Sequence, residues 1–98
     1  MNVALQFQSN VAWLDAQNDQ IFAYAKQEPG NTIITVTNLD PHNQQAGVVT
    51  IPAVLGLAPV FVVEDQFTGN HFDWRIGQNY VELNPHIVGK QFHLLKVL

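Results

Sequence analysis

Apolar and polar residues alternate along this sequence in short segments, a pattern typical of β-strands and unlike the period of a helix. In the clearest segment, Asn31 to Leu39, β-branched aliphatic residues are interleaved with threonines, which favours a pleated strand. Similar segments recur at regular spacing on both sides of it. They are Asn10 to Asp15, Gln20 to Gln27, Gly47 to Ile51, Pro59 to Asp65, His71 to Arg75, Asn79 to Leu83 and Gln91 to Val97.

Turn-forming residues separate these segments. Proline and glycine supply a fixed or a positive φ, and short Asp or Asn side chains hydrogen-bond to nearby backbone amides. Asp19 and Asp40 are expected to act in this second way, and the proline after Asp40 should hold that residue extended. The pattern therefore predicts an all-β fold, an antiparallel β-sandwich of about seven to eight strands with Greek-key connections.

Three segments allow more detailed expectations. Val60 to Val63 is apolar on both faces, which predicts a central strand. Phe72 and Trp74 alternate with polar and charged neighbours, so both are expected on the core side of one strand. Val54 to Leu57 lacks strand alternation, and a single helical turn is expected there.

Composition and charge narrow the function classes. The chain has 98 residues, of which 47% are hydrophobic and 12% charged, and this fits one domain. No apolar run is long enough for a membrane helix, and the start lacks the pattern of an export signal. The formal net charge is −4 with four scattered basic residues, so neither nucleic acid nor membrane is an expected partner. Without cysteine, a disulfide framework, a thiol nucleophile and a cysteine zinc site are excluded.

The polar residues do not form a recognisable catalytic or metal-binding arrangement. Glu64 and Asp65 are adjacent, so in a strand their side chains point to opposite faces and cannot flank one glycosidic bond. They are interpreted as a solvated strand end. The histidines show no metal-ligand spacing, and Ser9 lies outside any nucleophile motif. No catalytic residue, metal or cofactor is therefore predicted, and the isolated chain is not expected to be an enzyme.

Several motifs resemble a known family. The resemblance is carried in order by Asn18-Asp19-Gln20-Ile21, Ala23-Tyr24-Ala25-Lys26, Val36-Thr37-Asn38-Leu39-Asp40-Pro41-His42, Glu64-Asp65, Thr68-Gly69, Phe72, Trp74, Gly77, Asn79-Tyr80-Val81, Leu83 and Pro85. Together they resemble the C-terminal β-domain of the α-1,4-glucan:maltose-1-phosphate maltosyltransferases, which belong to glycoside hydrolase family 13 of the α-amylase superfamily.

This resemblance implies an accessory role. In that family the catalytic carboxylates lie in a barrel domain, and the sequence in hand contains no such barrel. The resemblance implies a non-catalytic domain that stabilises the barrel of a cytoplasmic enzyme acting on α-glucan. A second copy in a homodimer and α-glucan itself are further candidate partners. A related trehalose-forming or amylase-like parent stays open.

The head of the chain also fits this resemblance. Asn2-Val3-Ala4-Leu5-Gln6 is similar to the Asn-Pro-Ala-Leu-Gln stretch that ends the barrel in these enzymes. Residues 1–9 are therefore expected to be a remnant of the barrel end or a linker, and residues 10–98 to be the C-terminal β-sandwich domain. Val3, Leu5 and Phe7 are the expected interdomain contacts.

Aromatic residues allow one alternative function, a carbohydrate-binding module for α-glucan. Flat rings can stack on the apolar faces of sugars, and Trp13, Trp74 and Tyr80 are the candidates. Aromatic side chains also dominate sandwich cores, and this is the preferred interpretation of Trp74 and Tyr80. For Trp13 the sequence does not decide between a place in the core and one on the surface. A binding module would need an exposed, roughly coplanar pair of rings.

Overall fold

The computed structural model describes residues 11–87 and 91–98. The expected boundary between residues 1–9 and 10–98, and the expected interdomain contacts Val3, Leu5 and Phe7, fall on residues outside these ranges.

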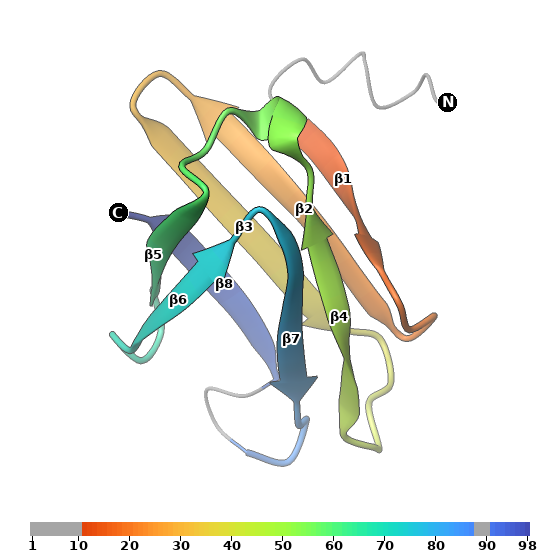
Figure 1. The fold of residues 1–98 in the computed structure, drawn as a ribbon. Helices are drawn as coiled ribbons and strands as arrows, with labels where there is room; N and C mark the ends of the chain where they lie inside the picture. Colours follow the sequence, from red (N-terminus) through yellow and green to blue (C-terminus); the bar gives the residue numbers. More distant parts are fainter. Residues whose placement is uncertain (1–10, 88–90) are drawn as a thin grey trace.

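The fold is all-β, as the alternation predicts (Figure 1). Eight antiparallel strands form one nearly closed, barrel-like sandwich in the order β6-β5-β8-β3-β2-β1-β4-β7. In the described residues no ladder joins β6 to β7, the two ends of this order. The elements are β1 (Val11–Ala16), β2 (Ile21–Glu28), β3 (Asn31–Asn38), β4 (Gln45–Ile51), the 3-10 helix η1 (Ala53–Leu55), β5 (Val60–Asp65), β6 (His71–Arg75), β7 (Gly77–Leu83) and β8 (Phe92–Val97).

The first four strands form the predicted Greek key. Strands β1, β2 and β3 are neighbours in sequence and in space, and β4 returns to lie beside β1. β1 pairs with β2 from Val11 to Leu14 and with β4 at Asp15 and Ala16. This one strand therefore passes from one layer of the sandwich to the other.

The turns follow the expected chemistry. Pro29 and Gly30 connect β2 to β3 between the paired residues Glu28 and Asn31. Gly30 has a φ of 73°, a conformation that favours glycine because it has no Cβ. In the turn between β1 and β2, Oδ1 of Asn18 accepts the backbone N–H of Gln20. At this turn the hydrogen-bonding side chain is thus Asn18, where the sequence pattern pointed to Asp19.

Apolar side chains from both layers fill the interior. The buried apolar residues are Leu14, Ile21, Ala23, Ala25, Ile34, Val36, Val49, Ile51, Leu55, Phe61, Val63, Trp74, Val81, Leu83 and Leu95. This set contains Trp74, which is 6% exposed and confirms its expected place in the core. The helical turn expected at Val54 to Leu57 is present as η1, which begins one residue earlier, at Ala53, and ends at Leu55.

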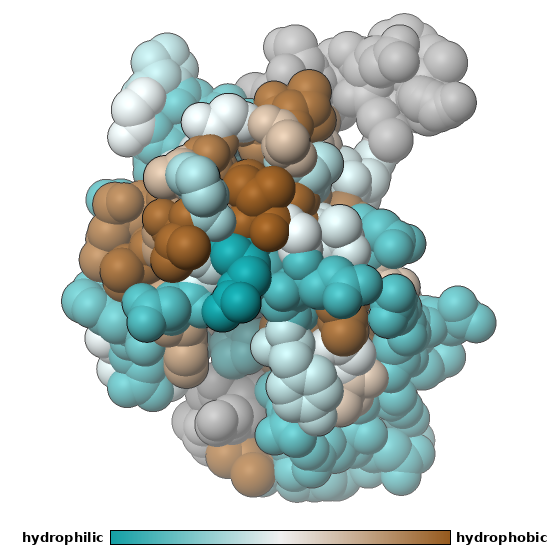
Figure 2. Space-filling view, in the orientation of Figure 1, coloured by the Kyte–Doolittle hydropathy of each residue, from teal (hydrophilic) through white to brown (hydrophobic). Residues whose placement is uncertain are grey.

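Strand β5 corrects one expectation. It lies between β6 and β8, so it is flanked on both sides as predicted for a central strand. However, only Phe61 and Val63 point inward, whereas Val60 is 64% and Val62 36% exposed. The apolar character of the second face therefore does not reflect burial in the domain. Figure 2 shows apolar residues gathered over η1 and β5 on this side of the molecule.

The loop after β3 has the predicted Asp40 geometry. No strand or helix continues through residues 40–43. Oδ1 of Asp40 accepts the backbone N–H groups of His42 at 2.9 Å and Asn43 at 3.2 Å, and Oδ2 accepts the side-chain amides of Asn43 and Gln45. The hydrogen bond from His42, followed by that from Asn43, lowers the pKa of Asp40 from 3.8 to about 2.

This pKa gives a pH-dependent prediction. Because the folded pKa lies below the unfolded value, Asp40 contributes stability above about pH 4, and the contribution is lost as pH falls towards 2. Asp40→Asn keeps an acceptor oxygen but cannot titrate, so its melting temperature should depend less on pH over this range. Thermal melts of both proteins between pH 2 and pH 5 check this. Parallel curves would show that Asp40 is not the titrating group.

Among the described residues, no helix is long and apolar enough to cross a membrane.

Candidate functional site

The structure places two groups of aromatic residues where they could contact a partner. The first lies on the outer side of β1 and β2. Trp13 and Phe22 are 42% and 41% exposed, and their ring centroids lie 4.8 Å apart. Tyr24 completes the group at 5.6 Å from Trp13 and 6.1 Å from Phe22. Trp13, which the sequence left open between core and surface, is thus a surface residue.

Strand register extends this group into a wider surface. One row of paired residues runs from Trp13 through Tyr24 and Thr35 to Leu94, across β1, β2, β3 and β8. The next row joins Phe22 and Phe92 through Thr37. Neither row contains a charged residue. We call these seven residues the outer aromatic face.

A charged row borders this face. In this row Lys26 of β2 pairs with Ile33 of β3, and Ile33 pairs with Lys96 of β8. Lys96 pairs in turn with Glu64 of β5, which pairs with His71 of β6. Nε2 of His71 lies 3.1 Å from Oε2 of Glu64. This hydrogen bond, and a weaker one from Gln66, lower the pKa of the Glu64 carboxyl. The face thus has an uncharged centre and a charged row along one side.

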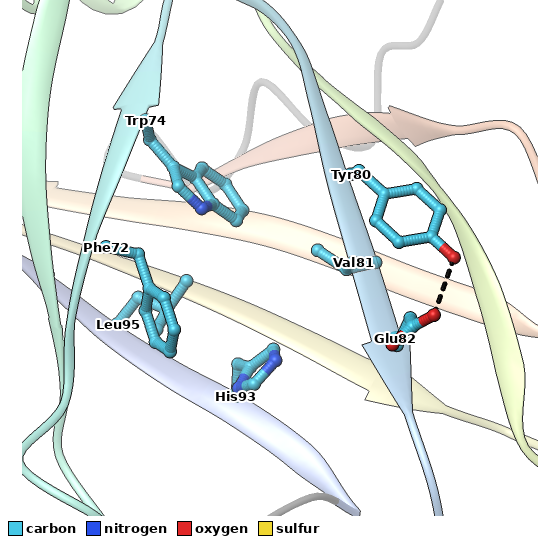
Figure 3. A pocket seen from close by; sticks show the side chains of 7 residues that line it. All are labelled: Phe72, Trp74, Tyr80, Val81, Glu82, His93 and Leu95. Carbon is cyan, nitrogen blue, oxygen red and sulfur yellow. Dashed lines mark hydrogen bonds between the residues drawn. The ribbon is translucent and has the colours of Figure 1, made fainter.

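The second group surrounds a pocket at the break in the sheet between β6 and β7 (Figure 3). Its volume is about 200 Å³. Trp74 and Phe72 project from β6 towards the gap, and His93 of β8 lies at its base. The residues that line the pocket are Phe72, Trp74, Tyr80, Val81, Glu82, His93 and Leu95.

A buried carboxylate holds His93 in place. Oδ2 of Asp65 lies 3.3 Å from Nδ1 of His93, and the two side chains are 2% and 12% exposed. Oδ1 of Asp65 accepts the backbone N–H groups of Phe67 at 2.8 Å and Thr68 at 3.4 Å. The interpretation of Glu64 and Asp65 as a solvated strand end is therefore wrong for Asp65. Because neighbouring strand residues point to opposite faces, Glu64 is on the outside and Asp65 turns inward.

Tyr80 at the pocket rim corrects another expectation. It was expected in the core, but it is 63% exposed. The inward positions of β7 are Val81, Leu83 and Asn79, whose amide satisfies backbone groups of Arg75 and Gly77. Because Asn79 is buried, the alternation along β7 places Tyr80 on the outside.

The Tyr80 hydroxyl donates a hydrogen bond of 2.8 Å to Oε2 of Glu82 on the same outer face (Figure 3). This bond raises the pKa of Tyr80, because it favours the protonated phenol beside a carboxylate.

Phe72 also departs from its expected burial. It shares a face with Trp74 as predicted, yet it is 37% exposed because it sits at the open end of the sandwich beside the pocket. Its ring centroid lies 6.0 Å from that of His93. Of the three predicted sugar-binding residues, the structure brings Trp74 and Tyr80 together at one pocket and leaves Trp13 outside it. His93 was missed as a pocket residue, because it comes from a strand far away in the sequence.

The described residues contain no group of three or more His, Cys, Asp or Glu that could hold a metal ion.

Comparison with known proteins decides the family. The family described as "GLGE, C-terminal" matches residues 13–97. The chain belongs to this family. Three relatives, all α-1,4-glucan:maltose-1-phosphate maltosyltransferases, illustrate the similarity. The Chlorobaculum tepidum protein is 38% identical over 87% of this chain, that of Picrophilus torridus 34% over 89%, and that of Corynebacterium glutamicum 39% over 86%.

The match confirms the resemblance carried by the motifs from Asn18 to Pro85. This GLGE C-terminal chain spans only 13 to 14% of the length of the relatives it matches.

Proposed function

We propose that this chain is a non-catalytic accessory domain of an α-1,4-glucan:maltose-1-phosphate maltosyltransferase, and that it packs through its outer aromatic face against the rest of that enzyme. The family match and the names of the relatives support the choice of parent enzyme. Since the chain corresponds to 13 to 14% of those relatives, most of such an enzyme would lie outside it and could cover this face.

The outer aromatic face is the observation that carries the proposal. Its centre combines partly exposed rings with threonine and leucine and has no charge, a composition typical of the core of a protein interface. The planes of Trp13, Phe22 and Tyr24 are inclined to one another by 54° to 67°. A sugar-stacking platform needs roughly coplanar rings, so this geometry favours a protein partner.

The carboxylates support a non-catalytic role. Glu64 is engaged with His71 and Gln66, and Asp65 is 1% exposed and held by the following turn and His93. Because they point to opposite faces of β5, these two carboxylates cannot flank one glycosidic bond at the roughly 5 to 10 Å that a catalytic pair needs across an open cleft. In the proposed enzyme this pair would thus take no part in the reaction, which would use groups outside this chain.

Weakening the outer aromatic face should destabilise the enzyme without unfolding the domain. In a chimera where this chain replaces the matching part of the Chlorobaculum tepidum enzyme, Trp13→Ala with Phe22→Ser should lower the melting temperature and increase proteolysis at the domain boundary. The same changes should cost the isolated chain about 1 to 3 kcal/mol and leave it folded, because both rings are only partly buried although they pack on each other and on Tyr24.

Val60→Ser is the matched control, because Val60 is apolar and 64% exposed on β5, outside this face. It should leave both proteins unchanged. If the double variant left the chimera as stable as the parent, the proposed contact would be wrong. If instead it abolished self-association of the isolated chain in light scattering, the face would serve a homodimer.

A further inference from the structure

The pocket between β6 and β7 has a polar group fixed at its base. Asp65, when ionised, can only accept hydrogen bonds, so Nδ1 of His93 carries the proton that joins them. In the neutral form of the ring Nε2 then has a free lone pair, and no hydrogen bond to it is found among the described residues. Because the Asp65 side chain is itself held by Phe67, the imidazole is preorganised to accept a hydrogen bond from a ligand.

Apolar and aromatic groups form the inner walls. The indole of Trp74 and the ring of Phe72 line the β6 side, Leu95 of β8 lies next to Phe72, and Val81 faces them from β7 (Figure 3). Phe72 is 37% exposed, so part of its ring is available for contact. Aromatic walls around a few fixed polar groups are the usual composition of a small-molecule site.

The opposite side of the pocket is the unpaired edge of β7. β7 pairs with β4 alone, so its backbone groups on the β6 side have no ladder partner in the described part of the chain. At the rim, the Glu82 carboxylate accepts the Tyr80 hydroxyl at Oε2 and has further lone pairs available. A ligand entering here would meet both hydrogen-bond acceptors and backbone donors.

Size and charge restrict the ligand. A volume of about 200 Å³ is below the roughly 300 to 1,000 Å³ of a site for a drug-sized molecule, which leaves room for one ring. Glu82 at the rim, Asp65 behind the base and a net charge of −4 disfavour an anion. A purely apolar ligand would leave the acceptor on His93 without a partner.

We propose that this pocket binds one pyranose ring of a neutral oligosaccharide, with the sugar against Phe72 and Trp74 and a hydroxyl donating to Nε2 of His93. Only the choice of an α-1,4-glucan as the oligosaccharide rests on the proposed parent enzyme. The site is separate from the outer aromatic face, so failure of the chimera experiment would not affect this proposal.

Tryptophan fluorescence can test the site in the isolated chain. The sequence has two tryptophans, so Trp13→Phe leaves Trp74 as the only reporter. Titration of this variant with maltotriose should give a saturable change with a dissociation constant on the order of 1 mM. Maltose 1-phosphate should bind at least about tenfold more weakly than maltose because of its charge, and Glu82→Gln should reduce that difference.

Two substitutions test the contacts in the same background. His93→Gln and Phe72→Ala should each weaken maltotriose binding by about tenfold. Phe22→Ser, on the outer aromatic face, is the matched control and should leave affinity unchanged. A thermal melt of each variant separates lost binding from lost folding. If His93→Gln unfolds, Phe72→Ala still tests the site, because Phe72 is 37% exposed and its loss should leave the domain folded.

The proposal would be overturned if maltotriose gave no saturable signal. It would also be overturned if the Phe72→Ala variant bound maltotriose as tightly as the Trp13→Phe background. Binding of cellotriose with the same affinity would keep a neutral-sugar site but reject the choice of α-1,4-glucan.

Discussion

Replacing Trp74 with alanine is expected to unfold the domain or to lower its free energy of unfolding by about 3 to 5 kcal/mol. The indole is only 6% exposed and belongs to the same buried cluster as Phe61 and Val63 of the adjacent strand β5. Its removal would leave a large cavity beside the existing pocket. A domain of this size has a total stability of roughly 5 to 15 kcal/mol, so this loss is a large fraction of it.

Thermal and denaturant melts of Trp74→Ala measure this effect. Trp13→Ala is the matched control, because it removes the same side chain from a site that is 42% exposed and should cost far less. A variant of Trp74 that kept its melting temperature but lost maltooligosaccharide binding would show that the indole acts mainly as a sugar-stacking platform. It would also contradict its place in the core.

Asp65→Ala is expected to cost about 3 kcal/mol of stability. The carboxylate is 1% exposed, accepts two backbone N–H groups of the turn after β5, and pairs with the nearly buried His93. Alanine would leave all of these donors without their partner in a region with little access to water. The turn to β6 and the anchoring of β8 should both be weakened.

Asp65→Asn is the control that separates the charge from the hydrogen bonds. The amide oxygen can still accept the N–H of Phe67, and the amide nitrogen can donate to the other tautomer of His93. Chemical denaturation of the three proteins should therefore rank them wild type, Asn, Ala in decreasing stability. Equal stability of wild type and Asp65→Ala would mean that water replaces these contacts and that Asp65 is not structural.

Local interactions explain why the strands and turns were predictable. Alternation and β-branched residues specify β3 from Asn31 to Asn38, and Pro29-Gly30 and Asp40-Pro41 specify the reversals on either side. Each of these signals acts within a few residues of itself, so the sequence alone carries it. The family is likewise indicated by the order of short motifs along the chain, which does not depend on how the strands pair.

In three strands, tertiary packing decided which side chains are buried, and the sequence pattern did not predict this correctly. In β7 the apolar Tyr80 faces outward while Asn79 is buried, because the asparagine amide satisfies backbone groups at the corner with β6. In β5 the residues from Val60 to Val63 are all apolar, so no polar residue shows which face is exposed to solvent. The sequence therefore could not distinguish Val60 and Val62 from core residues. Phe72 is exposed because the sandwich is open next to it.

The candidate sites depended entirely on strand pairing. Asp65 and His93 are 28 residues apart, and their contact exists only because β8 is inserted beside β5. The outer aromatic face likewise requires the register that aligns Phe22 with Phe92 through β3. The sequence by itself determined the strands, the turns and the family, because these follow from local preferences and shared motifs. Only the tertiary structure decided which side chains meet, because strand order and register are set by packing over the whole chain.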